Sequence, residues 1–338
     1  MSLCVNPLQK ECGKFMISLD FELQWGVLDH VSATSLYRDN IKNVWGVVPR
    51  LLDTFGKHGV HATFATVGMM FHRDFASLLQ QLPLLQPSYT DRSLSPYSRL
   101  EEIVKDRPEY YLAADLIGMI RDWPGMEIAS HTYSHYYCLE SGQAAGQFRA
   151  DMEMAVQVAG KAKVELKSVV FPRNQINDDY LKICSESGIE AVRTNEKGWM
   201  YKASGKKGNT LFKRIFRLLD VYVNLTGYNC YRTEGLMKSD GVVLIPSSRF
   251  LRPYNRKLAP LDFLKMRRIK NCMTHAARNG ELFHLWWHPH NFGSNVELNF
   301  RMLDEILEHY KRLNKCYGFT SVNMSEMTNL LKSDENNE

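Results

Sequence analysis

Short apolar runs alternate with longer segments of helical spacing along most of the chain. Seven runs have the length of buried β-strands, and they occupy residues 15–19, 60–68, 126–130, 167–171, 189–193, 242–245 and 282–287. Nearly continuous apolar runs are typical of parallel strands that are covered on both faces. Because strands and helices alternate without an internal repeat or linker, the pattern predicts one barrel-like α/β domain.

The segments between these runs predict helices. Apolar residues recur every three or four positions over 39–58, where Pro49 could kink or restart the helix and Gly59 would end it. Further helices are predicted over 141–163, 178–187, 260–279 and 297–314, and a short strand with a helix over 317–331. The expected divisions of the chain are an N-terminal extension at 1–14, a domain at 15–331 and a polar tail at 332–338.

Two segments inside the expected domain differ from this alternation. Residues 83–108 are rich in Pro, Ser, Tyr and charged residues, and they are typical of an inserted loop that could cover a site. Residues 202–225 mix basic and apolar residues and predict a basic amphipathic insertion. Its 202–219 part could contact a membrane surface or a lipid-linked substrate. The alternative is a helix packed on the domain with its lysines in solvent.

Composition narrows the class of protein. The net charge of +5 over 338 residues is mild and spread along the chain apart from 202–217, which argues against a dedicated nucleic-acid binder. Seven scattered cysteines without a CxxC pair favour a reducing compartment over a disulfide framework. The N-terminal residues lack the apolar core of a signal peptide, and no segment offers the ~18 consecutive apolar residues of a membrane span. We therefore expect a cytoplasmic location.

Two histidines, His131 and His135, directly follow the predicted strand at 126–130. Two imidazoles four residues apart lie on the same side of a single helical turn with Cβ atoms about 6 Å apart, which suits a shared metal ion. The spacing also recurs by chance, and Thr132 stands where the zincin signature has its catalytic glutamate. A metal site here needs a third ligand from another part of the chain.

Other strand ends carry polar side chains as well. Asp20 and Glu22 follow the first strand and point to the same side of it, so a cation would relieve their repulsion. Arg173 follows the strand at 167–171, and His288 and His290 follow the last strand. Alternatively, Asp20 and Glu22 are surface acids at a solvated strand end, and Arg173 is a solvated loop arginine.

Taken in order, the motifs are Asp-x-Glu (20–22), His-x-x-x-His (131–135), Phe-Pro-Arg-Asn-Gln (171–175) and Trp-His-Pro-His-Asn (287–291). This ordered set resembles the polysaccharide deacetylase family, carbohydrate esterase family 4. Residues 62–68 are also similar to the Ala-Thr-Phe-Phe strand of that family. The resemblance implies a distorted (β/α)7 barrel, which is a single α/β domain with inserted loops.

The resemblance also implies a metal-dependent deacetylase that acts on the N- or O-acetyl group of a sugar. Glu22, His131 and His135 match the ligands of a divalent metal ion, for which zinc is the favoured identity. Such an ion lowers the pKa of bound water from about 16 towards 7. Asp20 matches the general base, and His288 matches the general acid that protonates the leaving group.

Three features depart from the family pattern. The family has adjacent aspartates where this chain has Asp-x-Glu, which leaves the division of roles between Asp20 and Glu22 open. In the family, an arginine braces the base. Arg173 matches this arginine by its place in the order of motifs, whereas the sequence around Arg252 is more similar to the family motif but comes later in the chain. His290 could exchange roles with His288. The residues expected to bind substrate are Trp25, Trp199, Arg252, Tyr254, Trp287, His290 and Asn291.

The function expected from these residues is deacetylation, of an N-acetyl group by preference, on an acetylated sugar or sugar-linked precursor of a surface polysaccharide. One alternative is an amidohydrolase of the same fold that acts on a small cyclic amide. A second alternative is a sugar-binding pseudoenzyme, which the altered arginine motif leaves open. Binding of a stoichiometric metal ion would disfavour the pseudoenzyme.

Overall fold

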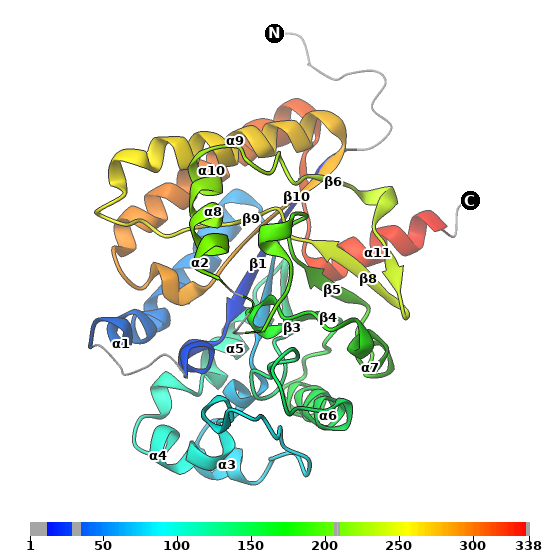
Figure 1. Cartoon of the computed structure of the whole chain (residues 1–338). Helices are drawn as coiled ribbons and strands as arrows, with labels where there is room; N and C mark the ends of the chain where they lie inside the picture. The colour runs from blue at the N-terminus through cyan, green and yellow to red at the C-terminus, as the bar shows by residue number, and fades with distance from the viewer. Residues whose placement is uncertain (1–11, 29–34, 206–207, 209, 336–338) are drawn as a thin grey trace.

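One curled sheet of seven parallel strands forms the centre of the molecule. The computed structural model describes residues 12–28, 35–205, 208 and 210–335, and its parallel strands lie in the order β10-β1-β2-β3-β4-β5-β8 (Figure 1). Their bounds are β1 (Lys14–Phe21), β2 (Ala62–Thr66), β3 (Met126–Ser130), β4 (Ser168–Val170), β5 (Ala191–Thr194), β8 (Val242–Pro246) and β10 (Glu281–Trp287). Each coincides with one of the apolar runs, so the strand prediction is confirmed.

A short segment after β8 joins the two sides of this sheet. The backbone nitrogen of Ser247 donates to Thr194 O of β5, and that of Ser248 donates to His284 O of β10, both at 2.8 Å. The next strand, β9 (Arg249–Phe250), then pairs in parallel with β10. The expected distorted (β/α)7 barrel is therefore confirmed as a curled sheet whose open side is bridged by residues 247–250.

Helices surround the outside of the curled sheet (Figure 1). They are α1 (Ser35–Lys42), α2 (Val44–His58), α3 (Phe75–Leu79), α4 (Leu100–Val104), α5 (Ala114–Asp122), α6 (Ala145–Lys161), α7 (Leu181–Glu186), α8 (Leu211–Tyr222), α9 (Asp262–Asn279), α10 (Val296–Tyr317) and α11 (Met324–Glu335). Short strands β6 (Tyr231–Arg232), β7 (Lys238–Ser239) and β11 (Thr320–Ser321) extend the sheet. Among the described helices, none has the length and apolar character needed to span a bilayer.

Two boundaries differ from the sequence prediction. The helix expected over 39–58 is two helices that break at Asn43, so Pro49 lies inside α2 and does not restart it, while Gly59 ends α2 with a φ of 61°. Helix α11 continues to Glu335, so the expected polar tail begins as helix. Residues 1–11 of the expected extension and 336–338 of the tail lie outside the described residues.

Alternation along the strands separates a helix-facing side from the interior of the barrel. On β10, Trp287 is buried and packs edge-on against Phe55 of α2. Trp286 and His284 lie on the other face of β10 and point to the interior. There, His284 Nε2 lies 2.8 Å from Ser18 Oγ of β1. The barrel interior is therefore polar towards the carboxyl ends of the strands.

Residues 83–108 and 202–225, the two segments that interrupt the alternation of strands and helices, lie at the carboxyl ends of the strands. Residues 83–108 contain α4, and Tyr89 there accepts a hydrogen bond at 2.8 Å from the backbone nitrogen of Tyr137. Residues 202–225 contain α8, whose Leu211 and Phe212 are 68% and 60% exposed. Positions 206, 207 and 209, which include two of the lysines of the basic segment, lie outside the described residues.

A buried carboxylate anchors α8 to the barrel. Asp220 lies at the carboxyl end of α8, with Oδ1 at 2.8 Å from a guanidinium nitrogen of Arg268 on α9 and Oδ2 at 3.2 Å from one of Arg249 on β9. Tyr201 also donates its hydroxyl to Oδ2 at 2.9 Å. One carboxylate thus neutralises two largely buried cations and fixes the position of α8.

Replacing Asp220 by Asn should lower the free energy of unfolding by about 3 kcal/mol, because Arg249 and Arg268 would remain in place without their anionic partner. Urea unfolding followed by circular dichroism measures the change. Burial alone raises the pKa of Asp220, but Arg249 and Arg268 outweigh it and leave the pKa below its ordinary value. The stabilisation should therefore be complete at neutral pH and decline as the pH falls through the lowered pKa.

The matched control is Asp122→Asn. This substitution removes an exposed ion pair with Arg121 and should change the stability little. Equal stability of the Asp220→Asn protein and the wild type at neutral pH would contradict the anchoring role of Asp220.

Candidate active site

Three side chains meet at the carboxyl end of the barrel. Glu22 Oε2 lies 3.0 Å from His135 Nε2 and 3.3 Å from His131 Nε2. One ligand atom from each of the three residues lies within 4.8 Å of the other two, and all three residues are buried. The structure thus brings together the three residues that the sequence suggested as metal ligands.

The protonation states of these three side chains suit coordination of a cation better than hydrogen bonds among themselves. His131 Nδ1 lies 2.8 Å from Val170 O, which can only accept, so Nδ1 carries the proton. In the neutral imidazole, Nε2 then presents a lone pair to the Glu22 carboxylate. Burial lowers the pKa of His135 to about 4, so this ring is neutral at pH 7 and also offers a lone pair. A cation between these groups would turn repulsion into coordination.

The two histidines do not lie on a helical turn, contrary to the sequence prediction. Residues 131–138 form an irregular loop after β3, in which Thr132 and His135 have φ values of 61° and 58°. The carboxylate of Asp151 on α6 holds this loop, because it accepts from the backbone nitrogens of Tyr133 and Ser134 at 2.6 and 3.1 Å. Two left-handed residues and one buried carboxylate therefore set the direction of the imidazoles.

A tight turn directs Glu22 into the same space. β1 ends at Phe21, Leu23 has a φ of 45°, and residues Leu23–Val27 form a 3-10 turn. A Cβ atom on Gly26 would lie 1.9 Å from Glu22 Oε1. Only glycine at position 26 leaves the carboxylate where it meets the two histidines.

Asp20 is held by an arginine that the sequence analysis did not select. Two guanidinium nitrogens of Arg193, at the end of β5, donate to the two carboxylate oxygens of Asp20 at 2.6 and 2.9 Å. Burial raises the pKa of Asp20, but Arg193, His131 and His288 outweigh that effect and leave the pKa lowered. Asp20 is therefore ionised at neutral pH.

Arg173, the arginine that the family resemblance matches to the bracing role, lies beside this pair. Arg173 has a left-handed backbone with a φ of 55°, and its guanidinium carbon lies 4.3 Å from the centre of the Tyr137 ring. Arg252 lies further along the site and is half-buried, with its guanidinium carbon 6.0 Å from the Phe250 ring. The arginine directly bonded to Asp20 is Arg193, and Asn174, next to Arg173, accepts from it at 2.8 Å.

His288 faces both carboxylates from the end of β10. Its Nε2 atom lies 3.4 Å from Glu22 Oε1 and 3.8 Å from Asp20 Oδ2, while Nδ1 lies 3.3 Å from Asn291 Oδ1. Asn291 was expected to bind substrate, and here it orients His288. His290 is buried, and burial together with the neighbouring His288 lowers its pKa to about 3. Position and charge therefore favour His288 over His290 as a proton donor.

Several expected substrate contacts lie elsewhere in the structure. Trp25 is buried and donates from its indole nitrogen to Tyr111 O at 2.8 Å. Trp287 packs into the helix-facing core, because β10 alternates and the preceding Trp286 takes the interior position. Trp199 is 52% exposed and stacks on Phe212 of α8, while the backbone nitrogen of Tyr254 donates to Asn299. Trp25 and Trp287 are thus buried side chains of the core.

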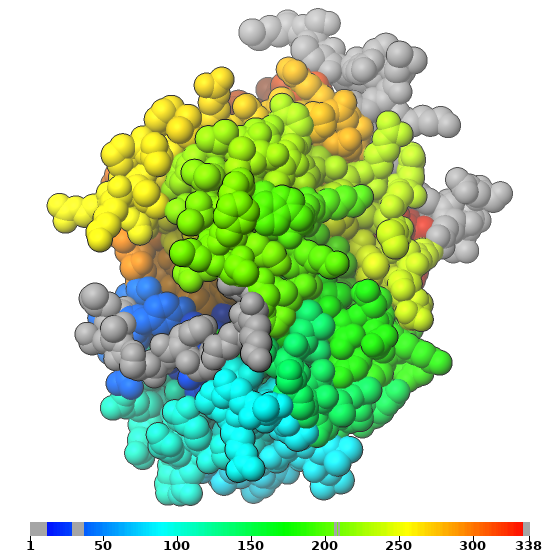
Figure 2. All heavy atoms as spheres, in the orientation of Figure 1, coloured from blue at the N-terminus to red at the C-terminus, as the bar shows by residue number. Residues whose placement is uncertain are grey.

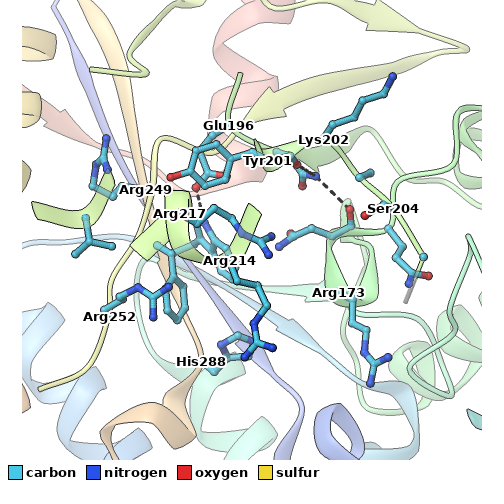
Figure 3. Close-up of a pocket in the computed structure, with 18 residues that line it drawn as sticks. Arg173, Glu196, Tyr201, Lys202, Ser204, Arg214, Arg217, Arg249, Arg252 and His288 are labelled. Carbon is cyan, nitrogen blue, oxygen red and sulfur yellow. Dashed lines mark hydrogen bonds between the residues drawn. The ribbon is translucent and has the colours of Figure 1, made fainter. Parts of the chain in front are cut away.

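A pocket of about 560 Å³ opens beside His288 (Figure 3). Trp286 forms one of its walls and donates to Glu196 Oε1 at 3.2 Å, and Arg252 also contributes to it. The residues that line this pocket, taken from the described part of the chain, include neither Trp199 nor Tyr254. Of the expected contacts, Arg252 is thus placed at the pocket, and Trp286 takes the place expected for Trp287.

Comparison with known protein families gives one match. Residues 39–192 match the family model described as polysaccharide deacetylase. This range contains His131 and His135 but ends one residue before Arg193, so Asp20, Glu22 and His288 lie outside it. No curated protein sequence matches the chain.

Solved structures share the fold over nearly the whole chain. A Mycobacterium smegmatis protein assigned to the polysaccharide deacetylases aligns with a TM-score of 0.60 and 14% identity, over 99% of this chain and 95% of the other. PuuE allantoinase aligns with a TM-score of 0.57 and 11% identity, over 98% and 97%. A Pseudomonas aeruginosa PAO1 protein, also assigned to the deacetylases, gives 0.52 and 12%, over 94% and 89%. Residues 39–192 are therefore similar to a polysaccharide deacetylase domain, and the chain has the fold of these solved structures.

Proposed function

We propose that this protein is a metal-dependent deacetylase that removes an acetyl group, by preference an N-acetyl group, from a sugar. The observation that carries the proposal is the convergence of Glu22, His131 and His135 next to two further polar groups. These are the Asp20–Arg193 pair, which joins β1 to β5, and His288, which follows β10. The family match over 39–192 supports the same class of reaction.

Each residue has a role that its position supports. Asp20 is ionised and anchored through both oxygens to Arg193, so it can accept the proton of an attacking water without moving. His288 lies on another side of the same space, with Nε2 directed at the two carboxylates. It is placed to deliver a proton to the leaving amine or alcohol of the sugar.

Glu22, His131 and His135 would hold the metal ion, and zinc is the identity that two imidazoles and one carboxylate favour. When bound, such an ion supplies Lewis acidity towards water and the acetyl carbonyl. The hydrogen bond from His131 Nδ1 to Val170 O fixes the tautomer that leaves Nε2 available. Asp151, through the loop backbone, keeps both rings aligned.

The substrate is proposed to be a sugar-linked precursor of a surface polysaccharide, and the protein to act in the cytoplasm. The six described cysteines are free, which is in keeping with a reducing compartment. Segment 202–219 would then meet a lipid-linked substrate or the membrane surface from the cytoplasmic side. Its exposed apolar residues on α8 support such a contact.

His131→Ala should abolish stoichiometric binding of a divalent ion, because only two ligands would remain. Elemental analysis of the purified protein should find about one ion per chain in the wild type, as expected for one three-ligand site. His309→Ala is the matched control, because this histidine bonds to Thr274 on the outer helices and should leave the metal content unchanged. Equal metal content in the wild type and His131→Ala would rule out this ligand set.

Asp20→Asn should lower kcat for acetate release about 10²- to 10⁴-fold and leave the metal content unchanged, because it removes the proton acceptor but no proposed ligand. The assay measures acetate from acetylated amino sugars, with a small cyclic amide tested in parallel. A metal-loaded wild type that releases no acetate from any acetylated sugar would contradict the deacetylase. Turnover of the cyclic amide instead would establish the amidohydrolase alternative.

Arg193→Lys should lower kcat about tenfold or more with little change in KM, because lysine cannot hold both oxygens of Asp20 in the reacting orientation. Arg173→Lys is the matched control and should change kcat less. Metal content and the thermal unfolding midpoint, measured for both variants, separate loss of orientation from loss of the fold. A larger kcat effect for Arg173→Lys would return the bracing role to Arg173.

A further inference from the structure

The pocket beside His288 is strongly cationic. Its lining contains six basic side chains and one acidic side chain, that of Glu196. The basic residues are Arg173, Lys202, Arg214, Arg217, Arg249 and Arg252. A neutral sugar needs no such surplus of positive charge, because its hydroxyl groups are bound by ordinary hydrogen bonds. The composition of the pocket indicates a substrate with an anionic group.

Two carboxylates, those of Asp220 and Glu196, lie among these cations. Asp220 is shared between Arg249 and Arg268, and Glu196 accepts a hydrogen bond from Trp286. Arg214, Arg217 and Arg252 form a group, because all three line the same groove beside α8. Burial lowers the pKa of Arg217, Glu196 opposes that effect and Arg214 adds to it. Clustered guanidinium groups repel one another, and a multiply charged anion would remove that cost.

Aromatic contacts connect the arginine group to the proposed acid. The Phe250 ring lies 5.9 Å from the His288 ring, and the guanidinium carbon of Arg252 lies 6.0 Å from the same Phe250 ring. Trp286 contacts both Phe250 and His288, at 4.7 and 5.8 Å between ring centres. In Figure 3, Arg214 extends from α8 towards His288. A sugar that reacts at His288 could thus carry a substituent that reaches the arginines.

A second, shallower groove shares the same arginines. Leu211, Ile215 and Leu218 of α8 line it together with the three arginines, and its volume is about 360 Å³. Leu211 and Ile215 are 68% and 46% exposed, and Figure 2 shows the yellow-green part of the chain that includes α8 on the molecular surface. One side of α8 therefore presents arginine side chains next to apolar side chains.

We propose that the arginine group formed by Arg214, Arg217 and Arg252 binds a phosphoryl group attached to the acetylated sugar. This inference rests on the proposed deacetylase function and specifies its substrate class. Guanidinium groups bind phosphate oxygens through paired charge-assisted hydrogen bonds, and three of them suit a phosphate or diphosphate. Two sources share this chemistry, a soluble nucleotide-linked sugar and a lipid-linked sugar, and the adjoining apolar groove is where an acyl or isoprenoid chain would lie.

The first test measures binding of inorganic pyrophosphate to the full chain by calorimetry, without turnover. The double variant Arg214→Gln, Arg217→Gln should weaken binding about tenfold or more, because each position loses hydrogen bonds to a charged group. Arg312→Gln is the matched control, because Arg312 is an exposed arginine of α10 that does not line the pocket, and it should leave binding unchanged. No binding by the wild type, or equal loss in the control, would overturn the proposal.

The second test compares kcat/KM for an acetylated amino sugar, its 1-phosphate and an acetylated uronic acid. The wild type should prefer the phosphate, and the double variant should lose most of that preference. Equal preference for the uronic acid would overturn the assignment to a phosphoryl group. If pyrophosphate binds but no sugar is deacetylated, the pocket assignment stands and the proposed function fails. If neutral sugars are deacetylated and pyrophosphate does not bind, the proposed function stands and the pocket assignment fails.

A third measurement distinguishes the two sources of the phosphoryl group. A nucleoside diphosphate-linked sugar and a sugar linked to a short isoprenoid phosphate are compared as substrates of the wild type and of Leu211→Gln. If the lipid-linked sugar is the better substrate and only its kcat/KM falls in Leu211→Gln, the groove on α8 binds the chain. If the nucleotide-linked sugar is better and the variant is unaffected, the phosphoryl group is of soluble origin. Either result supports the arginine group, whereas no turnover of either compound, with the neutral sugar still deacetylated, would overturn it.

Discussion

The pair between Asp20 and Arg193 depends on the curl of the sheet. β2, β3 and β4 lie between β1 and β5, so in a flat sheet the two strands would be roughly 19 Å apart, at ~4.8 Å per strand spacing. Their side chains nevertheless meet at 2.6 Å. The sheet must therefore curl until opposite sides of the barrel approach, and the same curl brings β3 and β10 to the centre with their histidines. A buried ion pair loses hydration, and here Ser18 and Asn174 supply further hydrogen bonds to the guanidinium.

The architecture and the cluster of Glu22, His131 and His135 are predictable because they follow from local patterns. Apolar runs locate the seven strands of the central parallel order, and parallel strands place the residues that follow them at one edge of the sheet. The sequence therefore groups Asp20, Glu22, His131, His135 and His288. The resemblance to the deacetylase family added an order to these residues, and the geometry now adds their distances.

The errors have specific physical causes. Arg193 lies inside an apolar run, and the strand pattern gives no sign of a polar role there, although a buried arginine needs an anion and Asp20 is that anion. Strand alternation from His288 indicates Trp286, not Trp287, as the inward-facing residue, because Trp286 shares the direction of His284. The turn assumed for His131 and His135 failed because the left-handed residues Thr132 and His135 have no glycine or asparagine to signal them.

The pairing of the first strand with the last has a consequence for how the molecule is made. In β1, Lys14 pairs with Leu282 of β10, so this edge of β1 stays without its partner until β10 has left the ribosome. At ordinary elongation rates that interval is on the order of tens of seconds. The proposed metal ligands are all synthesised within the first 135 residues, whereas the proposed acid arrives with β10. A nascent chain could thus bind the proposed metal ion before it has the proposed acid. Pairing of β10 with β1 would then complete the proposed active site.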